Sequence, residues 1–260
     1  MMETVAGRWP RLAPPVVAAA LILTGTAFRV VLTLNHVPNS DGDESTMGLM
    51  ALHIAQGRHL PVFFYGQHYM GSIEAILAAP AIALAGASVL ALRLPVLPLV
   101  YIAFGTLMYL LASRLYSRWY AVAVTAALAP ASYHVLAMQM RASGGYPELA
   151  AAGAAAVLLA VVTAGAADRS SWRHVLRFGL FGLVAGFVLW DDWLPLPYLA
   201  GSAVLLLAFC YRDLFGRCGV ALVAGFLAGA LPVIVKVVTG NGRAVLTEPL
   251  TIAMGAAPVP

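Results

Sequence analysis

The chain has 260 residues, of which 62% are hydrophobic and only 10% are charged, and its mean hydropathy is +0.87. A soluble domain carries about 25% charged residues and a disordered chain has low hydrophobicity, so both classes are excluded. Two cysteines exclude a disulfide scaffold, and a net charge of +4 without any basic block gives no indication of nucleic-acid binding. The composition therefore predicts an all-α, polytopic membrane protein.

Apolar stretches long enough to cross a bilayer recur along the chain. Runs of about 20 residues without charge are typical of transmembrane helices. The first run follows Arg8 and Arg11 and has no small-residue cleavage site, so we expect a signal anchor. The predicted spans are residues 14–34, 91–111, 119–136, 149–164, 176–189, 194–209 and 220–238.

One further apolar segment, residues 71–86, has two interpretations. As a span it would be short and would place Arg114 and Arg118 outside the cell. As a juxtamembrane or re-entrant helix it leaves every basic loop in the cytoplasm, which the positive-inside rule favours. We therefore expect one transmembrane domain over residues 1–260 with about seven spans and a cytoplasmic amino terminus, in the plasma (inner) membrane.

This topology places most acidic residues at the extracytoplasmic face. Only three of the eleven, Glu3, Asp168 and Asp213, fall on the cytoplasmic side. Acidic residues contribute little to orientation, so the asymmetry indicates an acidic site. The residues at the outer face are Asp41, Asp43, Glu44, Glu74, Glu148, Asp191, Asp192 and Glu248.

The densest acidic group directly follows the first span, where Asp41, Asp43 and Glu44 stand within four residues. Carboxylates this close repel one another unless a proton or cation neutralises them. Asp41 and Asp43 are candidate ligands of Mg²⁺ or Mn²⁺, and one acid is a candidate general base. The alternative is helix capping by Asp41, with Asp43 and Glu44 favoured in the first helical turn.

Two surface features follow this acidic group. Residues 44–56 have the pattern of an amphipathic helix, with Met47, Met50 and Ile54 on one face, and we expect this helix to lie flat on the bilayer. The aromatic stretch 60–70 comes next.

Within the aromatic stretch, Phe63, Phe64 and Tyr69 are expected to form part of an aromatic belt. Gln67 and His68 are candidate donors to phosphate or to sugar hydroxyls.

The second outer loop carries Arg141, Tyr146 and Glu148. The guanidinium of Arg141 is suited to a lipid phosphate, and Tyr146 is a further candidate contact to substrate. The alternatives are that Arg141 snorkels to headgroups and that Glu148 caps the next helix.

A third outer motif is Trp190-Asp191-Asp192-Trp193, which is typical of a span end in the aromatic belt. The alternative is that its aspartates contact the acceptor or a metal. Arg29, near the outer end of the first span, is expected to pair with one of these two aspartates.

These features, taken in order, resemble the C-fold (GT-C) glycosyltransferases. Asp43-Glu44 opens a helix after the first span, Tyr65-Gly66-Gln67-His68-Tyr69 follows, and Ala91-Leu92-Arg93-Leu94-Pro95 starts the next span. The order is most similar to the bacterial branch related to protein O-mannosyltransferases, the lipid A aminoarabinose transferase and the sugar transferases of rhizobial lipopolysaccharide. The resemblance covers about residues 14–148 well and continues more loosely to 240. Because the family is usually longer, we expect this chain to be the N-terminal part of a longer enzyme.

The resemblance implies roles for individual residues. Asp43, with Glu44 beside it, matches the family's first-loop carboxylate, which faces the acceptor and the reacting sugar, and Pro147-Glu148 matches the acid of the second outer loop. Relatives such as the aminoarabinose transferase bind donor phosphate with a Lys before the short apolar helix, whereas Gly71 stands there in this chain. The candidate substitutes are Arg141, Arg58 and His68.

Two functions are compatible with these residues. The first is a bacterial cell-envelope glycosyltransferase that moves a sugar, with inversion, from a polyprenyl-phosphate donor to a lipid, polysaccharide or protein acceptor outside the cytoplasm. The second is a lipid or solute transporter or flippase without bond chemistry. Transporter sites usually lie near the bilayer midplane, whereas the acids here cluster in outer loops, which favours the enzyme.

Overall fold

The computed structural model describes residues 9–67 and 69–239, and all regular structure within them is helical, apart from an isolated bridge between Phe63 and Gly71. The all-α prediction is therefore confirmed. The helices are α2 (Trp9–Leu34), α3 (Gly42–Ala55), α4 (Ile73–Ala85), α5 (Val89–Arg93), α6 (Leu97–Leu115), α7 (Arg118–Leu128), α8 (Tyr133–Met140), α9 (Tyr146–Ala164), α10 (Trp172–Asp191), α11 (Leu196–Cys210), η1 (Tyr211–Phe215), α12 (Arg217–Gly229) and α13 (Leu231–Thr239).

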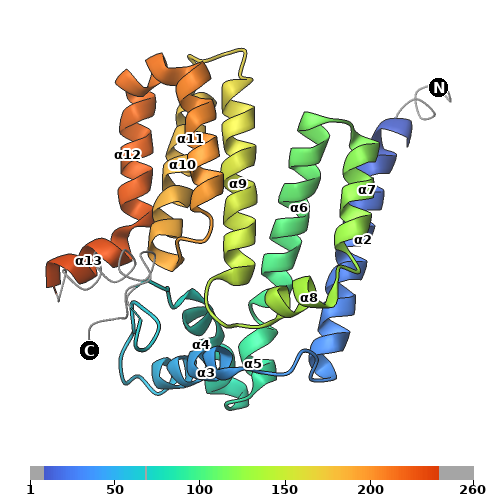
Figure 1. The fold of residues 1–260 in the computed structure, drawn as a ribbon, viewed down its shortest axis with the longest axis vertical. Coiled ribbons are helices and arrows are strands. Elements are labelled where there is room, and N and C mark those ends of the chain that lie inside the picture. Colours follow the sequence, from blue (N-terminus) through green and yellow to red (C-terminus); the bar gives the residue numbers. More distant parts are fainter. Residues whose placement is uncertain (1–8, 68, 240–260) are drawn as a thin grey trace.

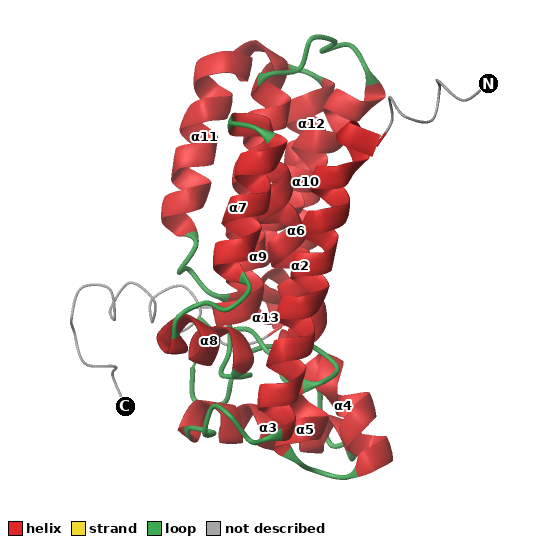
Figure 2. Cartoon of the chain, turned by 90° about the vertical axis from the view of Figure 1, so that its right-hand side faces the viewer, coloured by secondary structure: helices red, strands yellow, loops and turns green. Residues whose placement is uncertain are grey.

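The helices α2, α6, α7, α9, α10, α11 and α12 run alongside one another, and the helices α3, α4, α5, α8 and α13 gather at one end of them (Figures 1 and 2). Among the described residues, five helices are long and apolar enough to cross a membrane, or up to seven if each of two bent pairs counts as one span. The chain is thus a multi-pass membrane protein. The α9–α10 loop with Arg169, η1 with Arg212 and the start of α12 with Arg217 lie at the end opposite to α3, α4 and α5 (Figure 1).

Two predicted spans are not continuous helices. Residues 119–136 are divided between α7 and α8, which meet at 84°, and residues 220–238 between α12 and α13, which meet at 63°. Proline lacks the backbone N–H that a continuing helix needs, and Pro130 and Pro232 stand at the two breaks.

Arg29 stabilises the first of these breaks. Its guanidinium donates to the carbonyl oxygens of Leu128 (3.3 Å) and Ala129 (2.8 Å) and to Oε1 of Gln139 (2.7 Å). The expected ion pair between Arg29 and an outer aspartate is therefore wrong, because the carbonyls left free at the end of α7 take its donors.

Segment 71–86 forms α4, which is too short to count as a span and packs on α3 and α5. The structure therefore favours the interpretation in which this segment does not cross the membrane. Met47 and Met50 on α3 are fully buried in the same apolar cluster as Ala75 and Ala78 of α4. The prediction that α3 lies flat on the bilayer is wrong in this respect, because the protein itself covers the apolar face of the helix.

Helices α10 and α12 pack closely through glycines. A Cβ at Gly182 or Gly186 would collide with backbone of α12, and a Cβ at Gly225 or Gly229 would collide with backbone of α10. Each pair has the spacing small-xxx-small that lets two transmembrane helices approach closely. This contact fixes the end of α10, which carries Asp191.

Candidate functional site

The candidate site lies where the loop of residues 141–145 crosses α3 and α4. Its backbone is held by carboxylates from three helices. The N–H of Ala142 donates to Oε1 of Glu44 (3.0 Å), that of Gly144 to Oε2 of Glu74 (2.7 Å), and that of Gly145 to Oε1 of Glu148 (3.3 Å). Acids that are far apart in the sequence are thereby gathered under one loop.

Glu44 is fully occupied by a buried ion pair with Arg93. The Nε of Arg93 donates to Oε1 (2.7 Å) and its Nη2 donates to Oε2 (2.6 Å), while Nη1 donates to the carbonyl of Pro38 (3.0 Å). Both side chains are about 1% exposed. Such a bidentate pair fixes α3 against α5, so Glu44 is a positioning residue in this structure.

Three other carboxyl groups, those of Glu74, Glu148 and Asp191, form a cluster without a cation. Glu74 comes from the first turn of α4, Glu148 from the first turn of α9 and Asp191 from the end of α10. All three are buried, and the carboxyl of Glu148 lies within hydrogen-bonding reach of the other two. We call these residues the carboxyl cluster.

The carboxyl cluster has unused hydrogen-bonding capacity. Oε1 of Glu74, Oε2 of Glu148 and both carboxyl oxygens of Asp191 are buried without a donor. None of the ion pairs seen among the described residues involves these groups. Like charges this close are not all ionised at once, so the cluster must hold a proton or a cation.

The surroundings of Glu74 favour the protonated form of its carboxyl group. Burial raises the pKa of Glu74 well above its ordinary value, and the charges of Glu148, Asp191 and Glu44 raise this pKa further. The hydrogen bond from Gly144 opposes the shift. Glu74 therefore favours its neutral form and can share a proton with its neighbours.

The predicted Mg²⁺ or Mn²⁺ site receives no support from the arrangement of ligands. No group of three His, Cys, Asp or Glu side chains in the described part of the chain is placed to hold a metal ion. Asp41 caps α3 by accepting the N–H of Glu44 (2.9 Å), and it also contacts Ser143 (3.1 Å) and Arg141 (3.3 Å). Asp43 is exposed.

An apolar cavity of about 590 Å³ reaches the carboxyl cluster from between the long helices. Glu148 is the only charged residue among those that line it. The cavity is bounded by α6, α9, α10 and the α12–α13 break, with lining residues that include Leu107, Ala155, Phe187 and Pro232. A second apolar cavity of about 590 Å³ lies against Tyr146 and Tyr198.

The structure separates the residues predicted from the sequence. Helix α3, which carries Asp43, lies at the end of the molecule where α9 begins (Figure 1), and Glu148 is in the first turn of α9. Asp43 is exposed, whereas Glu148 is buried. Arg141 is 28% exposed and bound to Asp41, and its Nε donates to the carbonyl of Asn39 (2.9 Å). Arg58 is exposed.

The remaining predicted contacts are spread over this end of the molecule. Tyr146 lines the second cavity. Gln67 is half-buried with its Oε1 unpartnered, and His68 lies outside the described residues.

The sequence left Glu74 and Arg93 without an assigned role, and it gave a contact of Asp191 with substrate or metal only as the alternative to a span end. A signal for Glu74 was present, because an acid in an apolar segment is costly unless it is matched or functional. The belt interpretation was wrong for Phe63, Phe64 and Trp190, which are all buried in the protein. The indole of Trp190 donates to the carbonyl of Val62 (2.8 Å), which brings Asp191 inside with it.

Gly71 packs directly on Asp191. Its N–H donates to the Asp191 carbonyl (2.7 Å), and a Cβ at this position would collide with the Asp191 side chain. Any larger residue at this position would therefore displace the Asp191 carboxyl.

The chain matches no family model, and comparisons with curated proteins and with solved structures found no significant similarity.

Proposed function

We propose that the chain is a membrane glycosyltransferase that transfers a sugar from a polyprenyl-phosphate donor to an extracytoplasmic acceptor. The observation that carries this proposal is the position of Glu148, which joins a buried carboxyl cluster to an apolar cavity between the spans. A lipid-linked sugar needs an apolar groove for its chain and a polar end for its reacting group. The cavity and the cluster supply both at adjacent places.

In this proposal Glu148 is the general base. The acceptor hydroxyl gives its proton to the carboxylate as its oxygen attacks the anomeric carbon, and polyprenyl phosphate leaves from the opposite side with the bonding electrons. This displacement inverts the anomeric centre. The carboxyl cluster keeps the transferred proton within a buried network.

Arg141 is the candidate partner of the leaving phosphate. It begins the loop that covers the carboxyl cluster and is 28% exposed; its Nε donates to the Asn39 carbonyl (2.9 Å) and its Nη1 pairs with Asp41 (3.3 Å), which leaves Nη2 for a phosphate oxygen. A planar guanidinium can bind two phosphate oxygens at once. Arg93 is unsuitable, because Glu44 and the Pro38 carbonyl occupy its donors.

The test is sugar transfer in proteoliposomes from a radiolabelled polyprenyl-phosphate sugar. Glu148→Gln should lower the rate by about 10²–10⁴-fold, the usual contribution of a general base. Asp192→Asn is the matched control, since it removes a neighbouring acid outside the cluster, and should transfer at nearly the wild-type rate. If Asp43→Asn abolishes transfer and Glu148→Gln does not, the base is Asp43.

Proton-coupled transport is a second candidate, because a buried carboxyl cluster that shares a proton is also what such a carrier needs. The two functions differ in product. A carrier would move substrate across the proteoliposome membrane, with a dependence on the proton gradient, and would leave every sugar–phosphate bond intact.

A further inference from the structure

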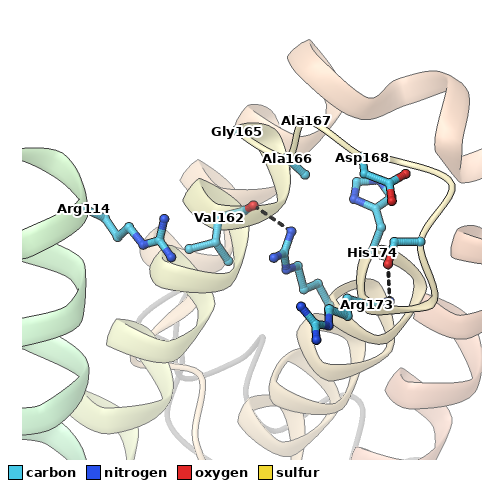
Figure 3. A pocket seen from close by; sticks show the side chains of 10 residues that line it. Arg114, Val162, Gly165, Ala166, Ala167, Asp168, Arg173 and His174 are labelled. Atoms are coloured by element: carbon cyan, nitrogen blue, oxygen red, sulfur yellow. Dashed lines mark hydrogen bonds between the residues drawn. The ribbon is translucent and has the colours of Figure 1, made fainter.

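A second site lies at the end of the molecule opposite to the carboxyl cluster. It is a pocket of about 300 Å³ between the end of α9, the loop that follows it and the first turns of α10, with Arg114 of α6 facing it (Figure 3). The lining residues are Arg114, Val162, Gly165, Ala166, Ala167, Asp168, Ser171, Arg173, His174 and Arg177.

The pocket is cationic. Three arginines, Arg114, Arg173 and Arg177, come from two helices, and Asp168 is the only acid among the lining residues. Arg177 is held in place because its Nη1 donates to the Val162 carbonyl (3.1 Å). Asp168 is engaged by the N–H (3.0 Å) and hydroxyl (2.7 Å) of Ser170. Three arginines against one acid leave the pocket with a net positive charge.

His174 gives an independent indication of a missing ligand. Its side chain is fully buried, its Nε2 is bonded to Oδ2 of Asp213 (3.0 Å), and its Nδ1 has no hydrogen-bond partner. A buried polar atom without a partner is costly. A ligand that reached Nδ1 would remove this cost.

We propose that this pocket binds the phosphate of an anionic lipid headgroup. Proteins bind phosphate through the guanidinium groups of arginine and through the free N–H groups at the N-terminus of a helix. Helix α10 begins at the pocket. The pocket lies at the ends of three apolar helices, where headgroups are found, and Trp172 beside it is 68% exposed, as is typical of a residue at the membrane interface. Basic pockets between transmembrane helices are suited to such headgroups.

The test compares lipid binding by two variants of the full chain in detergent. Arg114→Gln/Arg173→Gln removes two pocket charges from exposed side chains and keeps the Arg177–Val162 contact. Arg212→Gln/Arg217→Gln is the matched control, because it removes two exposed arginines at the same end that do not line the pocket. Binding of dioleoyl phosphatidylglycerol and of dioleoyl phosphatidylcholine is measured by native mass spectrometry, and thermal unfolding checks that each variant is folded.

The wild-type chain should bind phosphatidylglycerol at least about tenfold more tightly than phosphatidylcholine, and the pocket variant should lose this preference while the control keeps it. If the double variant does not fold, Arg114→Gln alone should weaken the preference. Competition by inorganic phosphate would support a phosphate site and would identify free phosphate as an alternative source of the ligand. Equal affinities in the wild type, the pocket variant and the control would overturn the proposal.

Discussion

Two adjacent acids at the start of α3 lie in opposite environments, which makes them a sensitive test of the structure. Glu44 is buried against Arg93, whereas Asp43 is exposed. Glu44→Gln should lower the free energy of unfolding by about 3–5 kcal/mol, because it leaves the buried Arg93 charge unmatched. Asp43→Asn should change it by no more than about 0.5 kcal/mol. Thermal unfolding in detergent measures both, and equal losses would contradict the assignment.

Glu74 should make stability depend on pH in a defined direction. Its pKa is higher in the folded chain than in the unfolded chain, so the folded chain binds more protons, and stability falls as the pH rises through the interval between the two values. Glu74→Gln stays neutral and keeps an acceptor for the Gly144 N–H. We expect the variant to be more stable than the wild type at about pH 8 and to lose less stability between about pH 5 and pH 8. Asp43→Asn should keep the wild-type slope, and an unchanged slope in Glu74→Gln would refute the assignment.

Among individual residues, the sequence predicted Glu148 as a site residue and gave helix capping as the alternative role of Asp41. It did not predict the carboxyl cluster, because Glu74 and Asp191 enter it through tertiary packing. Asp191 looks like the exposed end of a span until Trp190 is seen to bond to Val62, 128 residues away. The partner of Glu44 is likewise 49 residues away.

The glycine contact between α10 and α12 gives a prediction at the scale of elements. Gly186→Ala should lower the unfolding temperature, because its Cβ would collide with the Phe226 carbonyl and push the helices apart. Gly201→Ala in α11 is the control, since a Cβ there meets open space. We expect the control to match or exceed the wild type, as alanine is the better helix former. A stable Gly186→Ala variant would show that α10 and α12 do not pack this closely.

The positions of the long helices were predictable, because a run of apolar residues without charge is a local property of the sequence. The bends were not. Pro130 and Pro232 stand at the two breaks, but Pro14 and Pro15 lie inside the continuous helix α2. Proline alone therefore does not predict a break, which depends on partners such as Arg29 that satisfy the free carbonyls.

The two ends of the molecule carry polar groups of opposite kinds, acidic at one end and basic at the other. One end holds the carboxyl cluster under the 141–145 loop, and the other holds the arginine pocket and the basic loops. The positive-inside rule predicts that the end with the basic loops faces the cytoplasm. With that orientation, the proposed sugar chemistry and the proposed lipid contact would lie on opposite faces of the membrane.

This arrangement depends on α4 not crossing the membrane. Its 13 residues reach about 20 Å, short of a hydrocarbon core of about 30 Å, and it packs on α3 and α5 at one end of the bundle. The loops before and after α4 should therefore share one side of the membrane. Two exposed residues test this, Ser40 ahead of α3 and Ala87 directly after α4.

Single cysteines at Ser40 and Ala87 should both be labelled from outside, in a background in which the two native cysteines, which are buried, are replaced by alanine. In intact cells a membrane-impermeant maleimide should label the Ser40→Cys and Ala87→Cys variants. Ala167→Cys, in the exposed part of the α9–α10 loop, is the control. It should be labelled only after the membrane is permeabilised, because the positive-inside rule predicts that a loop with basic residues faces the cytoplasm. Labelling of Ser40→Cys and Ala87→Cys from opposite sides would mean that α4 crosses the membrane. Glu74 and Glu148 would then belong to opposite faces, and no single outer site could contain both.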